Sequence, residues 1–179
     1  MAEFVQSGQI FAGMPSGAAA LAPRVGLYTP EQRLRRDNSI WTLVQGLLAP
    51  FQFLVFLISL GLILRFLYTG EGLAAANLSV IAKTLTLYTI MITGAIWEKV
   101  VFGKYLFAPA FFWEDVVSMG VIALHTAYLV ALYTHSLTST QMMVLALSAY
   151  SIYVLNAGQF IWKLRRARLQ AASMKATAS

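Results

Sequence analysis

The stretch WTLVQGLLAPFQFLVFLISLGLIL, residues 41–64, decides the fold class of this chain. It holds no Asp, Glu, Lys or Arg, and it ends at Arg65. Crossing the hydrocarbon core of a bilayer takes roughly 20 apolar residues in a helix. The stretch therefore predicts a transmembrane helix, with a kink at Pro50 because proline lacks a backbone N–H.

The composition of the whole chain agrees with this interpretation. Of its 179 residues, 59% are hydrophobic and 11% are charged, whereas about 25% of the residues of a typical soluble domain are charged. A chain this short and this apolar is expected to form one all-α membrane domain. The absence of cysteine excludes disulfides, thiolate metal sites and cysteine nucleophiles, so any catalysis uses oxygen and nitrogen groups.

Three further stretches qualify as spans, and the second span is the weakest because Lys83 interrupts it. We expect this lysine to snorkel to the nearer membrane surface. The predicted organisation is a flexible N-terminal tail (1–27), a four-helix membrane domain (28–168) with spans at about 41–64, 77–97, 112–133 and 141–162, and a C-terminal tail (169–179).

Basic residues cluster in three of the segments outside the spans. They precede the first span, lie in the connection 98–111, and follow the last span. These segments share one side of a membrane that the chain crosses four times, and the positive-inside rule makes that side the cytoplasm. Both termini are therefore expected to be cytoplasmic. The same placement assigns the net charge of +6 to anionic lipid headgroups and not to nucleic acid.

Three carboxyl groups gather at the cytoplasmic ends of the second and third spans. Glu98 ends the second span in WEK, and Glu114 and Asp115 begin the third in WED. Glu114 shares a helical face with Ser118 and His125, because eleven residues return a helix to within about 20° of its starting direction. Like charges this close cannot all ionise cheaply, so at least one carboxyl is expected to keep its proton. General acid catalysis requires such a group.

Each of these features also has a purely structural explanation. Glu98 with Lys99, or Asp115 with Lys104, would form ion pairs at the membrane surface. The tryptophans at the span ends would form an aromatic belt. His125 would be a hydrogen-bonded packing residue.

Polar side chains inside the first and last spans predict hydrogen bonds between helices. Their spacing places them on faces that are expected to point into the bundle. They are Gln45, Gln52 and Ser59 in the first span and Tyr153, Asn156, Gln159 and Lys163 in the last.

Four blocks carry a resemblance to a known family: LYTPEQR at 27–33, WTLVQGLLAPFQFLVFL at 41–57, IWEKVVFGKYLFAPAFFWEDVVSM at 96–119 and ALHTAY at 123–128. Over residues 27 to about 168, the chain resembles the vinyl bacteriochlorophyllide hydratase family of phototrophic bacteria. The resemblance implies a hydro-lyase that adds water to the C3 vinyl group of chlorophyllide a or 3-vinyl bacteriochlorophyllide a, giving a 1-hydroxyethyl group on the route to bacteriochlorophyll a. It implies no cofactor, and a place in the bacterial inner membrane or its intracytoplasmic photosynthetic extension.

For this reaction the candidate catalytic residues are Glu114, Glu98, Asp115 and His125. Glu114 or Glu98 would protonate the vinyl group, and Asp115 or His125 would orient and deprotonate the attacking water. His125 has a second candidate role as the axial ligand of the Mg²⁺ that the substrate carries. Catalysis, ligation and packing all stay open for this histidine.

The candidate substrate-binding residues are aromatic or basic. Aromatic rings would stack on the macrocycle, and lysines would hold its propionate at the cytoplasmic surface. They are Trp97, Trp113, Phe111, Phe112 and Tyr105, with Lys99 and Lys104.

Two other functions are compatible with the sequence. A non-catalytic pigment-binding or assembly protein of the photosynthetic membrane would need His125 and the aromatic residues but not the acids. A proton-coupled transporter would need an intramembrane carboxylate with a partner near the opposite surface, and none is evident. Besides the pigment, the expected partners are membrane lipids and either a second copy or neighbouring enzymes of pigment biosynthesis.

Overall fold

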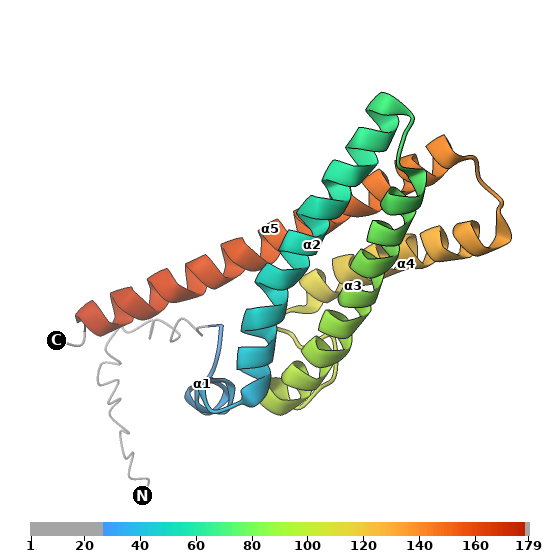
Figure 1. Cartoon of the computed structure of the whole chain (residues 1–179). Helices are drawn as coiled ribbons and strands as arrows, with labels where there is room; N and C mark the ends of the chain where they lie inside the picture. The colour runs from blue at the N-terminus through green and yellow to red at the C-terminus, as the bar shows by residue number, and fades with distance from the viewer. Residues whose placement is uncertain (1–26, 178–179) are drawn as a thin grey trace, which may run out of the picture.

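The structure, a computed structural model, describes residues 27–177 and is entirely helical in that part of the chain (Figure 1). The helices are α1 (Pro30–Asp37), α2 (Ile40–Thr69), α3 (Leu73–Phe102), α4 (Phe112–Thr134) and α5 (Ser139–Thr177). Helices α2 to α5 are long and apolar enough to cross a membrane. The predicted all-α fold with four spans is thereby confirmed, including its weakest span. The predicted N-terminal tail lies outside the described residues except for its last position, and the cytoplasmic placement of the termini stays a prediction.

The helices extend beyond the apolar stretches that predicted them. Helix α2 continues past Arg65 to Thr69, and α5 continues past Trp162 through the basic segment to Thr177. Residues 169–177 are therefore helical, although the sequence predicted a tail there. A helix ends where its backbone is capped or broken, which need not coincide with the end of its apolar stretch.

Helix α1 precedes the first span and was not predicted. The Thr29 hydroxyl accepts a hydrogen bond from the Gln32 N–H (3.2 Å), and the Gln32 side chain accepts one from the Thr29 N–H (2.9 Å). Pro30 follows the cap, where its missing N–H costs nothing. This reciprocal capping fixes the start of α1 and hence the approach of the chain to α2.

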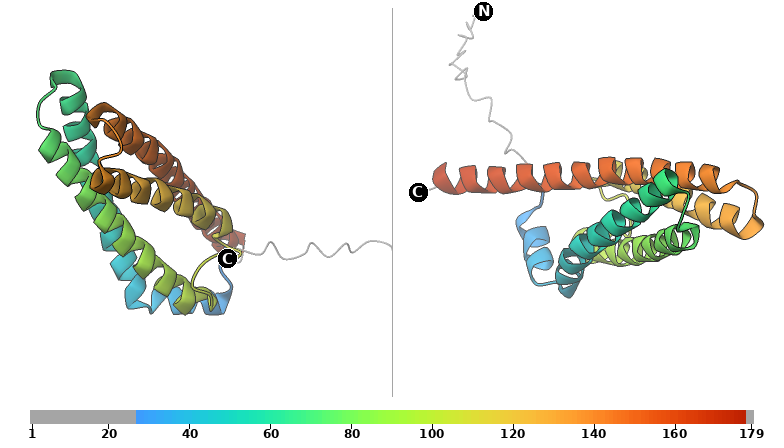
Figure 2. Two further views of the ribbon diagram at one scale, coloured as in Figure 1. Left: turned by 90° about the vertical axis from the view of Figure 1, so that its right-hand side faces the viewer. Right: turned by 45° about the horizontal axis from the view of Figure 1, so that its top comes forward.

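The four long helices form two hairpins, α2–α3 and α4–α5 (Figures 1 and 2). Gly70 ends α2 in a left-handed conformation (φ 74°), which glycine adopts without strain. His135 ends α4 in the same conformation (φ 50°). Both turns lie at one end of the molecule, and from there α2 and α5 diverge towards the end that carries α1 (Figure 1).

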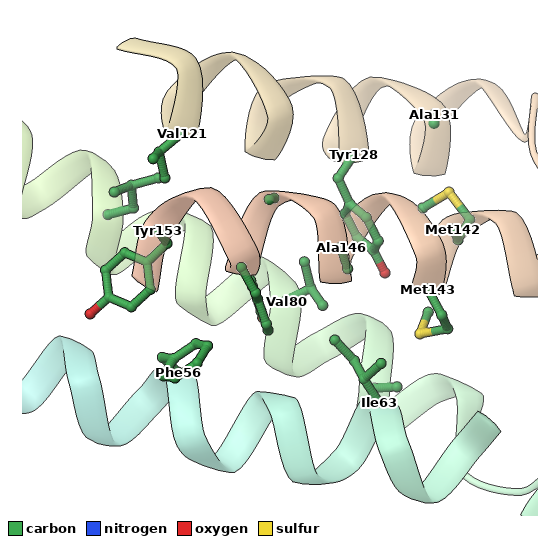
Figure 3. Close-up of a cluster of buried hydrophobic side chains, with 14 residues drawn as sticks. Phe56, Ile63, Val80, Val121, Tyr128, Ala131, Met142, Met143, Ala146 and Tyr153 are labelled. Atoms are coloured by element: carbon green, nitrogen blue, oxygen red, sulfur yellow. The ribbon is translucent and has the colours of Figure 1, made fainter. Parts of the chain in front are cut away.

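The main hydrophobic core joins the hairpins over the halves that carry the turns (Figure 3). Phe56 and Ile63 of α2, Val80 of α3, Tyr128 of α4 and Met143 of α5 all belong to it. The parts of α2, α3 and α5 nearest α1 lie outside this cluster. Room is therefore left between the hairpins at that end.

Hydrogen bonds between polar side chains run through this core. The Ser59 hydroxyl lies 2.6 Å from the Tyr150 hydroxyl and 2.7 Å from that of Ser79. The Tyr128 hydroxyl donates to Asn77 Oδ1 (2.8 Å). The inward direction predicted for Ser59 is confirmed, and these hydroxyl groups have the partners that buried polar groups require.

Lys83 does not snorkel as predicted. Its side chain is fully buried, and its Nζ lies 3.7 Å from the centroid of the Tyr153 ring of α5. Within residues 27–177, Nζ has no hydrogen-bond partner. The prediction was wrong because residue 83 lies on a side of α3 that points into the bundle, where the Tyr153 ring replaces part of the lost hydration.

The assignment of the core predicts unequal losses of stability when two adjacent residues of α2 are replaced by alanine. Ile63 is fully buried, whereas Leu64 is 50% exposed towards the surroundings of the bundle. Ile63→Ala removes packing contacts and should lower the free energy of unfolding by roughly 2 kcal/mol or more. Leu64→Ala should change it by less than 1 kcal/mol, and thermal unfolding of the detergent-solubilised protein compares the two. Equal losses would contradict the assignment of the core.

Candidate functional site

A cavity of about 940 Å³ lies between the two hairpins at the end that carries α1. It is lined by α1, by the first half of α2, the second half of α3 and the middle of α5, and by residues between 106 and 118. Binding sites for small molecules commonly measure about 300–1,000 Å³, so this cavity admits a large ligand.

Small residues on three helices create this volume. Gly46 and Ala49 of α2, Gly94 of α3 and Ala157 of α5 all line the cavity. A methyl group added at Gly46 would meet nothing within 4 Å. Larger apolar side chains complete the walls: Phe53, Leu87, Ile90, Met91, Phe160 and Ile161. The walls are thus suited to a large, mainly apolar ligand.

Two carboxyl groups interrupt the apolar lining at the same place. Glu98 of α3 and Asp115 of α4 both line the cavity, are about 95% buried, and lie within hydrogen-bonding reach of each other. The connection between these helices supplies the other contacts: the Phe107 N–H donates to Asp115 Oδ2 (2.7 Å), and the Ala108 N–H donates to Glu98 Oε2 (3.3 Å). Two carboxyl groups form a hydrogen bond only by sharing a proton. With one proton between them, the two groups would be a proton donor beside a proton acceptor.

Glu114, the third predicted carboxylate, is neutralised by a partner from α5. Its Oε2 accepts a hydrogen bond from Lys163 Nζ at 2.6 Å, and the side chain does not line the cavity. The alternative ion pairs predicted from the sequence, Glu98–Lys99 and Asp115–Lys104, do not form within the described residues. Glu98 and Lys99 are neighbours in α3 and point to different sides of the helix, whereas Lys163 of α5 reaches Glu114 across the hairpin.

Polar groups also line the deeper wall of the cavity. Asn156 Nδ2 donates to Ser118 Oγ (2.7 Å), which confirms one of the predicted hydrogen bonds between helices. Asn156 Oδ1 is buried and has no partner among the described residues. Nearer α1, Gln45 in the second turn of α2 also lines the cavity and donates to the Thr93 hydroxyl (2.7 Å). The free amide oxygen of Asn156 is available to a hydroxyl group or to water that enters the cavity.

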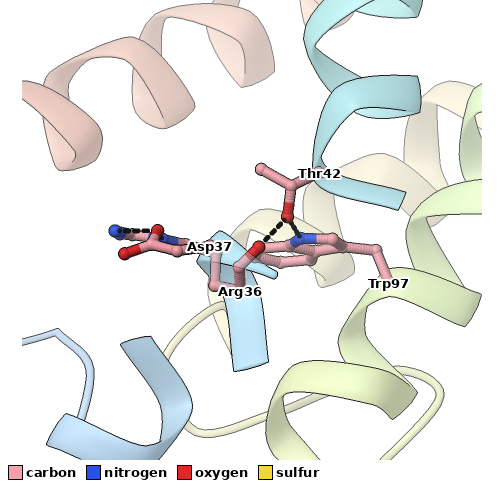
Figure 4. A network of polar contacts seen from close by, with 4 residues as sticks. All are labelled: Arg36, Asp37, Thr42 and Trp97. Atoms are coloured by element: carbon pink, nitrogen blue, oxygen red, sulfur yellow. Dashed lines mark hydrogen bonds and ion pairs between the residues drawn. The ribbon is translucent and has the colours of Figure 1, made fainter. Parts of the chain in front are cut away.

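Two of the predicted aromatic residues lie in the cavity wall. The Trp97 indole N–H donates to the Thr42 hydroxyl (2.9 Å), which in turn donates to the Arg36 carbonyl (2.6 Å; Figure 4). Phe111 is buried between Trp97 (ring centroids 5.7 Å apart) and Phe160 (5.8 Å). These contacts hold both aromatic rings in fixed orientations beside the carboxyl pair.

Tyr28, just before α1, extends this aromatic cluster at the cavity's rim. Its ring stacks on Phe102 with centroids 5.7 Å apart, and burial raises the pKa of its hydroxyl group. The residue therefore stays neutral at physiological pH and serves as an apolar wall.

The other predicted substrate-binding residues lie outside the cavity lining. Their side chains are exposed on the surface of the bundle, and that of Trp113 is 70% exposed. Lys99 donates to the Gly103 carbonyl (3.0 Å). The residues concerned are Tyr105, Phe112, Trp113, Lys99 and Lys104.

His125 is buried in the core and does not line the cavity. Its Nδ1 lies 2.8 Å from the Val121 carbonyl oxygen, and its ring stacks on Tyr150 with centroids 5.7 Å apart. These contacts agree with the packing role among the three roles left open by the sequence.

Sequence reasoning did not single out the basic residues that line the cavity, Arg33 and Arg36 of α1 and Arg168 of α5. The helix that carries the first two could have been predicted, because TPEQ at 29–32 is a capping box with proline at the first helical position. No local pattern shows that Arg168 of α5 lines the same cavity as residues of α1.

Comparison with known proteins assigns the chain to a family. The family model described as 2-vinyl bacteriochlorophyllide hydratase matches residues 28–166. The chain belongs to this family. The matched region includes all five helices except the end of α5, and every cavity residue named above apart from Arg168.

Two curated relatives carry the same description. The protein from Rhodobacter capsulatus is 69% identical over 150 residues, which cover 84% of this chain and 87% of the relative. The protein from Cereibacter sphaeroides is 70% identical over 148 residues, which cover 83% of this chain and 92% of the relative. No solved structure matches the chain.

The ion pair between α4 and α5 predicts non-additive effects on stability. Lys163→Met leaves the buried Glu114 without a partner, which costs roughly 3–5 kcal/mol for a fully buried pair and less here because Lys163 is partly exposed. Lys163→Met combined with Glu114→Gln should recover most of the lost thermal stability. Lys99→Met, which removes an exposed lysine, is the control. Additive losses in the double variant would show that the two side chains do not interact.

Proposed function

We propose that this protein adds water across the vinyl group of a chlorophyllide, using Glu98 and Asp115 as the acid and base. The substituent is numbered C3 on the macrocycle here and position 2 in the names of the relatives. One observation carries the proposal: two buried carboxyl groups within hydrogen-bonding reach of each other lie in the wall of an apolar cavity of about 940 Å³. The family supports the substrate class, because both relatives are named for vinyl bacteriochlorophyllide hydration.

The reaction needs one proton donor and one proton acceptor. The protonated carboxyl transfers its proton to the terminal CH₂ of the vinyl group, which becomes a methyl group. The positive charge left on the adjacent carbon is delocalised over the conjugated macrocycle. A water oxygen bonds to that carbon, and the second carboxylate takes the proton that the water releases. Transfer of this proton across the carboxyl pair restores the starting state, so the net change is the addition of one water molecule.

The contacts of the two carboxyl groups suggest which one acts first. Asp115 accepts the shorter backbone hydrogen bond, 2.7 Å against 3.3 Å for Glu98, and hydrogen bonds from N–H groups favour the ionised form. We therefore assign the proton donor to Glu98 and the base to Asp115. Glu114 is a poor candidate because Lys163 holds it as an ion pair.

The cavity walls supply the remaining requirements. Trp97, Phe111 and Met91 offer flat or adaptable apolar surface to a macrocycle. The free oxygen of Asn156 can hold the attacking water from the deeper side. His125 is assigned to packing, since the Mg²⁺ of a ring bound in this cavity would not meet a residue outside its lining.

The location of the reaction follows from the spans and from the charges of the loops. We place the protein in the bacterial inner membrane, with both termini and the open end of the cavity on the cytoplasmic side. Basic residues at the open end of the cavity support this orientation.

Removing either carboxyl group should abolish hydration while leaving pigment bound. Glu98→Gln and Asp115→Asn keep the shape of the site, and general acid or base catalysis typically contributes 10²- to 10⁴-fold in rate. Membranes containing each variant are incubated with chlorophyllide a in H₂¹⁸O, and mass spectrometry measures the product that carries one labelled oxygen. A fall of about 100-fold or more is expected for both.

The matched control is Glu71→Gln, which changes an exposed carboxylate in the turn between α2 and α3. It should retain normal turnover. Full activity of both site variants would sink the assignment of acid and base. Binding without any turnover by the unaltered protein would instead favour a pigment carrier.

Filling the cavity should prevent binding. Gly46→Leu directs a side chain into the open space that a methyl group at this position would enter. Gly61→Leu is the control, because Gly61 also has open space around it but lies outside the lining of the cavity. Pigment fluorescence should show at least tenfold weaker binding to the first variant and unchanged binding to the second. Equal binding to both would place the ligand elsewhere.

A further inference from the structure

Three arginines line the cavity, and the exposure of Arg33 and Arg168 places these two where it opens to the surface. Arg33 and Arg36 come from α1 and Arg168 comes from the last part of α5, so residues from opposite ends of the described chain line one cavity. Asp37 is the acidic lining residue beside them. The lining thus changes from apolar walls and a carboxyl pair inside to guanidinium groups at the mouth.

Only one of the three arginines is neutralised by a carboxylate of the described chain. Arg36 Nη2 lies 2.7 Å from Asp37 Oδ1, and its guanidinium lies 4.6 Å from the centre of the Tyr28 ring. Arg33 and Arg168 are exposed, and neither forms an ion pair with a described carboxylate. Two guanidinium groups at the mouth are therefore able to bind an anion.

The position of Arg168 relative to the carboxyl pair follows from the helix. Lys163 marks the level of the acids along α5, since it binds Glu114, which is the neighbour of Asp115. Arg168 is five residues further on, about 8 Å along the helix axis. A ligand that reaches both places must carry its reactive group and its anionic group at well-separated positions.

Among the described lining residues, the arginines are the only basic ones. Lys99 and Lys104, which the sequence suggested for the propionate of the substrate, are exposed outside the cavity. An anionic group on a ligand in the cavity therefore meets its basic partners only at the mouth.

We propose that Arg33 and Arg168 bind the free propionate carboxylate of the chlorophyllide and thereby select the free acid over an esterified pigment. This inference rests on the proposed function. A guanidinium offers a planar fork of N–H donors that matches a carboxylate, and such charge-assisted pairs are roughly twice as strong as neutral hydrogen bonds. An ester at the same position has no negative charge to pair with Arg33 and Arg168, and it would place an alkyl group beside them.

The test measures binding separately from turnover. The probe is a chlorophyllide whose vinyl group has been reduced to ethyl, so that it cannot be hydrated, prepared as the free acid and as its methyl ester. Binding to the full chain in zwitterionic lipid nanodiscs is followed by quenching of tryptophan fluorescence. The protein should bind the acid at least tenfold more tightly than the ester, and Arg33→Gln with Arg168→Gln should bring the two dissociation constants within about twofold of each other.

Matched controls lie on the same two helices. Arg35→Gln on α1 and Arg165→Gln on α5 remove exposed arginines outside the cavity lining, and both should keep the preference for the acid. Equal binding of acid and ester by the unaltered protein would overturn the proposal. So would equal weakening of both ligands, or an effect that appears only in anionic nanodiscs, which would assign the arginines to lipid headgroups.

The outcome is independent of the reaction itself. A protein that prefers the acid but fails to hydrate the vinyl form would contradict the proposed function and support the arginine site. A protein that hydrates acid and methyl ester equally well would do the reverse.

Discussion

The two hairpins pack together chiefly over the halves that carry their turns, and the rest of the molecule depends on this unequal packing. Large residues such as Phe56, Ile63 and Tyr128 fill the space at one end (Figure 3). At the other end, Gly46, Ala49 and Gly94 leave it open. A bundle packed evenly along its length would have a continuous core and no room for a large ligand.

The same packing decides which acidic residues face the cavity. Glu98 and Asp115 come from different hairpins, so their contact is made where the hairpins meet at the wall of the cavity. The connection between α3 and α4 supplies both with backbone N–H donors, which fixes their carboxyl groups. Lys163 removes Glu114 from this group by pairing with it. Two carboxyl groups, instead of three, are left facing the cavity.

Much of this arrangement could be predicted from the sequence, because it depends on local physical constraints. The cost of a polar backbone in hydrocarbon makes a long apolar stretch a helix, and four such stretches gave the fold. The blocks WEK and WED flank one connection, so the meeting of Glu98 and Asp115 follows from chain connectivity. Heptad spacing correctly placed Ser59 inside the bundle.

The features that were missed depend on how the helices are rotated and crossed. The spans are apolar nearly all round, so hydropathy does not show which face meets a neighbour. The environment of Lys83 and the Lys163–Glu114 pair could not be read from sequence for this reason. Arg168 reaches the cavity only because α5 continues as a helix beyond its apolar part. Such contacts are properties of the assembled bundle and leave no local pattern.

The most direct test of the central claim is an experimental structure of the protein with a vinyl-bearing chlorophyllide bound, determined in a lipid nanodisc with the Glu98→Gln variant to prevent turnover. The account predicts that the macrocycle lies between the two hairpins, with its vinyl carbons within about 4 Å of the side chains of residues 98 and 115, close enough for proton transfer. A macrocycle bound on the outer surface of the bundle, or one in the cavity whose vinyl group points away from these side chains, would contradict it.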